Sequence, residues 1–405
     1  MPWPAPLQHR DFRRYILSMF LALNGSWTLR VAIGWVAWSM TGQASFVGFV
    51  AFLTLAPTIL ASPLFGVLAD RIDLKRAAFT IQFLMAGVAA ILGVAELAGL
   101  LGPALLSILA LVFGLAMAAY HPVRLSLAPR LVPRDQIARA IPVISINFNL
   151  SRFIGPFVAG LLIGLFGPAA AFLAASAAVV PILVVLPRLH LREREDETRP
   201  RHPFIESLAE GFGVIRRSES IRLALLLTGL SAIPVRGVQE ILPAIADGVF
   251  ARGPEGLGQL TAAAGIGAVA ASAWMIRHPV REGDGLPTRS VLAAWFGLVL
   301  VAALAHAPLW PIALTIVAAV GGAGTLTAVG IQSAIQMQLE DGIRGRVMSV
   351  WVVVAIGAMA LGAVALGGLV DAFGLPVALG LTSVACALLL VVPTWRAGRL
   401  ARRPV

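Results

Sequence analysis

The sequence contains little charge, one cysteine and a single lysine. Only 13% of its 405 residues are charged, whereas 59% are hydrophobic, and the mean hydropathy is +0.88. Soluble domains carry about a quarter charged residues, so this composition predicts a membrane protein. The single Cys386 lies in the last apolar run, and it excludes both a disulfide within the chain and a thiolate metal site.

The residue patterns of common enzymes are missing as well. The histidines form no His-x-x-x-His pair, and the chain has no Gly-x-x-x-x-Gly-Lys-Ser/Thr phosphate loop. No Ser/His/Asp set shares a predicted depth in the membrane. We therefore predict that the protein is not an enzyme, is not driven by ATP, and holds neither a cofactor nor a metal. The six histidines are His9, His121, His190, His202, His278 and His306.

Long apolar runs fill the chain and predict its fold. A bilayer core of roughly 30 Å needs about 20 helical residues, and twelve such runs are present. The Pro-rich start and the long first run argue against a cleavable signal peptide. We predict an all-α membrane protein with twelve transmembrane helices at roughly 14–40, 45–68, 77–99, 103–124, 138–166, 168–187, 221–248, 256–276, 289–307, 309–336, 346–370 and 374–394.

The basic residues predict the orientation. If the N-terminus is inside and the chain alternates, 27 of the 31 basic residues fall on the cytoplasmic side and only Arg252 falls outside. This positive-inside bias places both termini in the cytoplasm, in the cytoplasmic membrane of a bacterium. The net charge of +11 then faces anionic lipid, and we expect no nucleic-acid partner.

The longest polar stretch divides the chain into two halves. We predict an N-terminal six-helix half at 1–187, a cytoplasmic linker at 188–220 and a C-terminal half with a short basic tail at 221–405. Within the linker, apolar residues recur at helical spacing from Phe204 to Ile215, which predicts an amphipathic helix at the inner membrane surface.

The two halves repeat one another. Three glycines of the first half recur 207 residues later in the second: Gly155, Gly160 and Gly167 match Gly362, Gly367 and Gly374. Span two matches span eight at an offset of 210 residues, so that Gly48 corresponds to Gly258. Two parallel six-helix halves place a substrate site near the midplane, where the halves meet.

Three arginines lie inside predicted spans. Arg30, Arg152 and Arg236 are each roughly 20–24 Å from their cytoplasmic boundaries, counted at 1.5 Å per helical residue. A charge at mid-membrane costs at least about 2.5–3.5 kcal/mol, so such residues face protein or water. We predict a positively charged cavity for a negative or zwitterionic ligand. The predicted substrate-binding residues are Asn24, Trp27, Arg30, Asn149, Arg152, Arg236, Gln239, Gln332 and Gln336.

Glu240 is the one acidic residue that we place deep within a span, and we predict that it couples transport to protons. Arg236 lies four residues earlier and is able to pair with it on the same helix. The alternative is a structural role, in which the arginines and Glu240 neutralise each other as a clamp between helices. In that case Glu240 carries no coupling proton.

A compact charged loop follows the second span. It reads Gly66-x-x-x-Asp70-Arg71-x-x-x-Lys75-Arg76, between two apolar runs without charge. The string resembles the loop signature of the major facilitator superfamily, although any membrane protein can carry a charged turn. The resemblance implies a cytoplasmic gate, in which Asp70 interacts with a helix N-terminus or with an arginine.

A second string lies on span five. Gly155-Pro156-x-x-Ala159-Gly160 resembles the Gly-Pro-x-x-Gly-Gly signature of exporters in this superfamily, with close helix packing alone as the alternative. Together with the loop after span ten, these strings give our predicted gating residues: Gly66, Asp70, Arg71, Arg76, Gly155, Pro156, Gly160, Arg344 and Arg346.

Further strings resemble the transmembrane secretion effector branch, which includes macrolide and enterobactin exporters. They are Asn24-Gly-Ser-Trp27, Leu131-Val-Pro133, Glu210-Gly-Phe212 and Arg344-Gly-Arg-Val-Met-Ser349. Many members carry an acidic residue after the glycine of the first helix, where this chain has Ser26. That departure puts proton coupling at this position in doubt.

The resemblance implies a monomeric secondary transporter in the lipid bilayer. It would export small amphipathic molecules by alternating access of its halves, coupled to protons. The alternatives are an uptake or lipid-flipping permease of the same fold and a receptor or scaffold that has lost transport.

Overall fold

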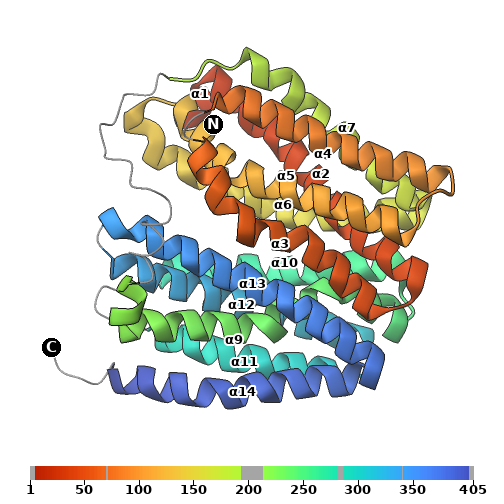
Figure 1. The fold of residues 1–405 in the computed structure, drawn as a ribbon, viewed down its shortest axis with the longest axis vertical. Coiled ribbons are helices and arrows are strands. Elements are labelled where there is room, and N and C mark those ends of the chain that lie inside the picture. Colours follow the sequence, from red (N-terminus) through yellow and green to blue (C-terminus); the bar gives the residue numbers. More distant parts are fainter. Residues whose placement is uncertain are drawn as a thin grey trace. The chain divides into compact units, whose positions relative to one another are not determined.

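The computed structural model describes residues 5–69, 72–192, 213–278, 280, 286–339 and 341–400, and within these ranges the regular structure is helical (Figure 1). The α-helices are α1 (Ala5–Gln8), α2 (Arg10–Thr41), α3 (Ala44–Ala69), α4 (Leu74–Leu97), α5 (Pro103–Leu127), α6 (Ile137–Phe166), α7 (Pro168–Val185), α9 (Glu219–Glu240), α10 (Gly253–Arg277), α11 (Thr288–Leu304), α12 (Trp310–Met337), α13 (Asp341–Phe373) and α14 (Leu375–Leu400). Short 3₁₀ turns η1 (Ala128–Leu131), η2 (Arg134–Gln136) and η3 (Leu186–Arg188) and a π-helical turn η4 (Ala244–Val249) connect them.

The predicted fold class is confirmed. In the described part of the chain, ten helices are long and apolar enough to cross a membrane, and two shorter apolar helices cover Ala44–Ile59 and Thr288–Leu304. Together they match the twelve predicted spans in number and position. Large apolar side chains remain exposed, such as Phe83 at 63% and Leu388 at 68%, as expected of surfaces that face lipid.

Two boundaries differ from the prediction. The apolar run 221–248 is not one helix, because α9 ends at Glu240 and the π-helical turn η4 follows Pro243. Pro243 has no backbone N–H to continue the ladder of α9. Span 346–370 also begins earlier than predicted, because α13 starts at Asp341, so that Arg344 lies in its first turn rather than in the loop after span ten. The predicted amphipathic helix lies outside the described residues up to its last turn, and residues 213–217 are helical.

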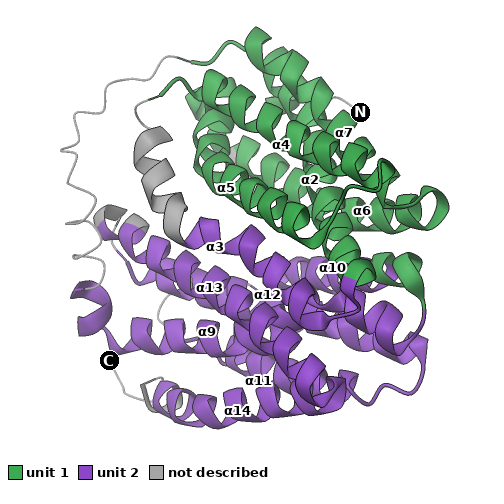
Figure 2. Cartoon of the chain, turned by 45° about the vertical axis from the view of Figure 1, so that its right-hand side comes forward, with its two compact units in different colours: residues 1–40, 60–200, 252–258 green, residues 41–59, 201–251, 259–405 purple. Residues whose placement is uncertain are grey.

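The chain separates into two compact units (Figure 2). Unit 1 contains residues 1–40, 60–200 and 252–258, and unit 2 contains residues 41–59, 201–251 and 259–405. Two helices belong to both units: α3 changes unit after Ile59, and α10 changes unit after Gly258.

Each unit has its own core. In unit 1 the largest buried side chains include Phe12 and Tyr15 of α2 and Phe172 of α7. In unit 2 small residues let helices approach closely. A Cβ added to Gly237 of α9 would lie 2.8 Å from the backbone of Gly362 on α13, so only glycine fits. Such small-residue contacts are typical of helices in membranes, where van der Waals packing drives association.

The sequence repeat reappears as equivalent backbone geometry. Gly167 and Gly374 follow the ends of α6 and α13, and both adopt a positive φ, +84° and +80°. Gly155 packs on α2 just as Gly362 packs on α9, the corresponding helix of the other half. The 207-residue offset therefore relates structurally equivalent positions.

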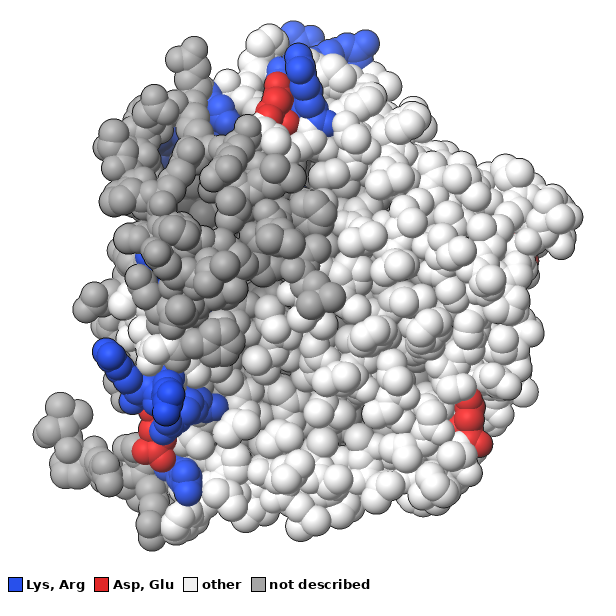
Figure 3. All heavy atoms as spheres, viewed as in Figure 1, with Lys and Arg blue, Asp and Glu red and all other residues white. Residues whose placement is uncertain are grey.

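Charged side chains gather near helix ends. On the face shown in Figure 3, the Lys and Arg side chains of the described residues form groups near the top and left margins, and the broad white surface to their right carries charge only as acidic side chains toward its right side. This distribution fits helices that cross a membrane and end in water.

Candidate substrate-binding site

Helices α2 and α6 of unit 1 touch at Gly155. A Cβ added to Gly155 would lie 2.5 Å from Cβ of Trp27 and 2.9 Å from the carbonyl oxygen of Asn24. Thr28 Oγ1 donates a hydrogen bond of 3.0 Å to the Gly155 carbonyl oxygen. The missing side chain at Gly155 therefore brings the polar stripe of α2 directly against α6.

Two of the predicted arginines meet at this contact. The guanidinium carbon of Arg30 lies 5.7 Å from the centroid of the Trp27 ring, and that of Arg152 lies 5.9 Å from the same ring. Both distances fall within the range of about 6 Å for cation–π attraction. Arg30 comes from α2 and Arg152 from α6, and both are half-buried. Their equal predicted depth thus corresponds to one shared position on Trp27.

The aromatic contact extends to a third arginine that the sequence analysis missed. Phe148 of α6 meets Trp27 edge to face, with centroids 6.1 Å apart, and the guanidinium carbon of Arg124 lies 4.8 Å from the Phe148 centroid. The predicted span 103–124 ends at Arg124, and this residue lies in the last turn of α5, where it is only 9% exposed.

The two asparagines of the prediction have different surroundings. Asn24 Nδ2 donates to the Phe20 carbonyl oxygen at 2.7 Å and to Ser151 Oγ at 3.2 Å, so this side chain joins α2 to α6. Its Oδ1 is buried and accepts no hydrogen bond from the described groups. Asn149 is exposed and donates to the Ser145 carbonyl oxygen of its own helix at 2.9 Å. The structure therefore places Asn24, but not Asn149, at the contact between α2 and α6.

The remaining predicted ligand contacts lie in unit 2. Arg236, Gln239 and Glu240 are half-buried in the last turn and a half of α9. A Cβ at Gly324 of α12 would lie 3.6 Å from Cδ of Arg236, so the arginine's aliphatic stem packs near α12. Gln239 Nε2 donates to the Val235 carbonyl oxygen of its own helix at 3.1 Å.

A cleft of about 730 Å³ lies between α10 and α12 of unit 2. Gln336 and Arg344 line it together with Ser272, Ser333, Met275 and Met337. The guanidinium of Arg344 donates to the carbonyl oxygens of Gln336 and Leu339, both at 3.0 Å, and so satisfies the end of α12. Gln332, also half-buried on α12, is not among the lining residues. The cleft combines apolar walls with a cation, which suits an amphipathic anion.

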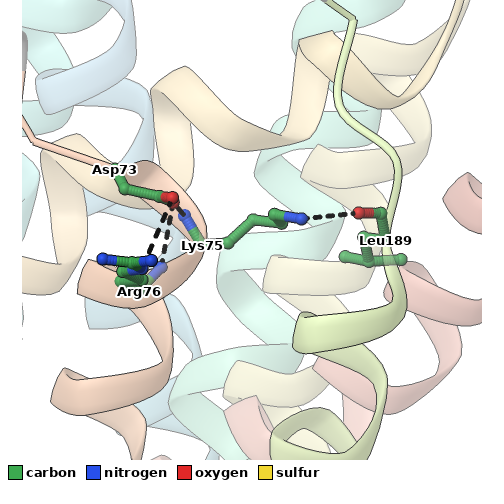
Figure 4. A network of polar contacts seen from close by, with 4 residues as sticks. All are labelled: Asp73, Lys75, Arg76 and Leu189. Carbon is green, nitrogen blue, oxygen red and sulfur yellow. Dashed lines mark hydrogen bonds and ion pairs between the residues drawn. The ribbon is translucent and has the colours of Figure 1, made fainter.

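The charged loop after α3 is described only in part. Asp70 and Arg71 lie outside the described residues, and of Gly66 only its place in α3 is described. Asp73 caps α4: its Oδ1 accepts the backbone N–H groups of Lys75 at 2.8 Å and Arg76 at 3.1 Å (Figure 4). These backbone bonds, that of Arg76 foremost, lower the pKa of Asp73. The predicted gating residue Arg76 has an exposed side chain 3.9 Å from Asp73, so its contacts are those of a helix cap.

Lysine 75 extends this cap toward a distant segment. Lys75 Nζ donates a hydrogen bond of 3.1 Å to the carbonyl oxygen of Leu189, which follows α7 and η3 (Figure 4). The start of α4 is thereby attached to the beginning of the predicted linker within unit 1.

The other predicted gating residues lie at helix contacts. A Cβ at Gly160 would lie 2.7 Å from Cα of Gly258, which joins α6 to the first turns of α10. Pro156 is inside α6, one turn before Gly160. Arg346 lies in α13, where its carbonyl oxygen accepts a bond of 2.7 Å from Ser349 Oγ. Among the described residues, no group of three or more His, Cys, Asp or Glu side chains is arranged to hold a metal ion.

Solved transporter structures share this fold. The chain is similar to a bacterial homolog of the human lysosomal transporter Spinster, with a TM-score of 0.72 and 15% identity over 97% of both chains. It is also similar to the nucleoside transporter NupG, with a TM-score of 0.73 and 12% identity over 95% of this chain and 98% of the other. At these identities the likeness shows the fold alone.

Sequence relatives cover nearly the full length. The enterobactin exporter EntS of Escherichia coli O1:K1 / APEC is 28% identical over 396 residues, which are 95% of this chain and 92% of that exporter. The EntS of Shigella boydii serotype 4 (strain Sb227) is similar to the same degree. The profile of the transmembrane secretion effector family matches residues 2–401. The chain therefore belongs to the transmembrane secretion effector family and is a multi-pass membrane transporter of the major facilitator type.

Proposed function

We propose that the protein is a secondary active exporter of small amphipathic molecules. The observation that carries this proposal is the full-length match to the secretion effector family, supported by exporter relatives that align along 95% of the chain. An uptake or lipid-flipping permease and a receptor without transport are the alternatives.

Transport by this fold proceeds by alternating access. We propose that the six-helix halves at 1–187 and 221–405 rock about a midplane site, joined by the cytoplasmic linker at 188–220. The basic residues support an orientation with both termini in the cytoplasm, in the bacterial inner membrane. In this orientation the ligand enters from the cytoplasm and leaves on the other side.

The arginine cluster supports an anionic or zwitterionic ligand with an apolar or aromatic part. Arg30 and Arg152 share the Trp27 ring, so two positive charges lie beside an aromatic surface. A guanidinium holds carboxylate or phosphate through two parallel hydrogen bonds, while the ring offers apolar contact to the rest of the ligand. Arg236 was predicted at the same depth, and it adds a third charge in this proposal.

Proton coupling is assigned to Glu240. It is the acidic residue placed deepest in the predicted spans, and it ends α9, where the helix gives way to the π-helical turn. A carboxyl group at such a helix end can take up a proton and release it as its access to water changes.

Binding of matched ligands tests the arginine assignment. Purified Arg30→Gln and Arg152→Gln proteins should bind an anionic amphiphile about 1–3 kcal/mol more weakly than the unmodified protein, with binding of a neutral analogue unchanged. Arg139→Gln is the matched control, because Arg139 is an exposed arginine on the same helix as Arg152. Equal losses for both ligands would make the two arginines structural and contradict the proposed ligand class.

A further inference from the structure

Asp371 holds the beginning of α3 from a helix more than three hundred residues away. Its Oδ1 accepts the backbone N–H of Ala44 and its Oδ2 accepts the backbone N–H of Ser45, both at 2.8 Å. These N–H groups belong to the first turn of α3, which has no partners for them within the helix. The positive end of the α3 dipole adds to the attraction. One carboxylate on α13 therefore caps α3 with both of its oxygens.

The helix backbones touch directly beside this cap. Gly48 of α3 lies against the carbonyl of Ala363, and Gly367 of α13 lies against the carbonyl of Ala44, with no space for a Cβ at either glycine. Small residues thus allow the closest possible approach of the two helices next to Asp371. Gly368, the next residue, has nothing within 4 Å of an added Cβ, so the tight contact is confined to one face of α13.

Larger side chains separate the same helices farther along. Leu55 packs on Met359 and Ala360, and the partly buried Phe52, Ile59 and Ile356 surround them. The backbones of α3 and α13 therefore touch next to Asp371, whereas larger side chains pack between the two helices toward Ile59. Ile59 is also the last residue of α3 in unit 2, because the helix continues into unit 1 from residue 60.

The corresponding contact of unit 1 has glycine at the position of Asp371. There α6 meets α10 at Gly160 and Gly258, the equivalents of Gly367 and Gly48. The 207-residue offset places Gly164 where α13 has Asp371. The nearby carboxylate is Glu255, whose Cγ would lie 3.1 Å from a Cβ at Gly164, and Glu255 belongs to the first turn of α10 itself. The carboxylate beside Gly164 therefore lies on α10 itself, whereas Asp371 caps α3 from the opposite helix.

We propose that Asp371 is a positioning residue that keeps the α3–α13 contact closed. The proposal rests on the proposed function, in which the six-helix halves at 1–187 and 221–405 move against each other. Because α3 belongs to the first half and α13 to the second, that movement acts on the contact between these two helices. Both hydrogen bonds sit at the end where the backbones are closest, so their loss frees the tight end of the contact.

Cysteine labelling tests the proposal without any substrate. Cys386 is replaced by Ser, and Val47→Cys introduces a thiol at a position that is 1% exposed beside the tight contact. Purified protein in nanodiscs is treated with a charged maleimide. With Asp371 present we expect slow labelling. With Asp371→Asn, which loses the charge and one acceptor, we expect labelling about tenfold faster, and with Asp371→Ala faster still.

Two controls separate opening of the α3–α13 contact from a general change in thiol reactivity. Glu255→Gln removes a carboxylate from the first turn of the equivalent helix and should leave labelling at residue 47 unchanged. Gln43→Cys is exposed and should react at one rate in all variants. The proposal would be overturned if Val47→Cys were labelled at the same rate in the unmodified, Asp371→Asn and Asp371→Ala backgrounds. It would also be overturned if Glu255→Gln accelerated labelling as much as Asp371→Asn does.

A second pair of variants covers the case in which Asp371→Asn fails to fold. Gly367→Ala retains the carboxylate but forces a methyl group into the tight contact, whereas Gly368→Ala adds the same methyl group to open space. Labelling should accelerate in the first variant only, and equal rates would contradict the proposal. Absence of transport in the unmodified protein would instead overturn the proposed function and leave the labelling result standing.

Discussion

The contact between α2 and α6 gives a quantitative prediction, because Gly155→Ala introduces a defined clash. The new methyl carbon would lie 2.5 Å from Cβ of Trp27 and 2.9 Å from the carbonyl oxygen of Asn24. Carbon atoms pack best about 3.5–4.0 Å apart, so the helices must separate by about 1 Å. Overpacking of this kind costs about 1–3 kcal/mol.

Two smaller effects enter the same estimate. Separation weakens the 3.0 Å hydrogen bond from Thr28 to Gly155, which contributes about 0.5–1.5 kcal/mol. Alanine regains up to about 1 kcal/mol through its better helix propensity. The two nearly cancel, so we expect Gly155→Ala to lower the free energy of unfolding by about 1–3 kcal/mol.

The matched control is Gly87→Ala in α4, where an added Cβ meets nothing within 4 Å. This variant should be neutral or stabilised by up to about 1 kcal/mol, from helix propensity alone. Unfolding of both purified variants in detergent, followed by tryptophan fluorescence, measures the difference. Equal stability of the two variants would refute the close approach of α6 to α2 and, with it, the geometry around Trp27.

Three further predictions concern charged residues. Asp73→Ala should lower the free energy of unfolding by about 0.5–1 kcal/mol at pH 7, because it removes the α4 cap. The backbone bonds to Arg76 and Lys75 lower the pKa of Asp73, so this difference should be full above about pH 4 and vanish as the pH falls through the folded-state pKa. Denaturation of both proteins at pH 7 and at pH 3 measures it. Asp70→Asn should leave membrane insertion intact but slow transport, and a well-folded variant with the unmodified transport rate would contradict a gate at this loop. Glu240→Gln should abolish flux driven by a pH gradient while leaving ligand binding in place, and full gradient-driven flux would remove the coupling role from Glu240.

Much of the fold follows from the sequence because membrane spans are set by a single physical requirement, an apolar run long enough to cross the bilayer. The break after Glu240 was missed because the run 221–248 has the length and mean hydropathy of a single span despite Arg236 and Glu240. Pro243, the local signal, is compatible with either a kink or a helix end.

The sequence predicts the depth of the site residues in the membrane but not the directions of their side chains. Counting residues placed Arg30 and Arg152 at one level, whereas their meeting on Trp27 depends on side-chain directions and on the approach permitted by Gly155. Arg124 was missed because it closes an apolar run, where an arginine at the water boundary is the ordinary expectation. The cap that Asp371 forms on α3 was not predictable, since no residue spacing relates Asp371 to the first turn of that helix.

Transport into proteoliposomes tests the central claim most directly. Purified protein is reconstituted with an imposed pH gradient, and uptake is measured for a panel of anionic and cationic amphiphiles. The account predicts saturable, gradient-dependent flux of an anionic or zwitterionic compound, reduced in Arg152→Gln and unchanged in Arg139→Gln. Flux no greater than that of protein-free liposomes for every compound, from a protein shown to be folded, would contradict it.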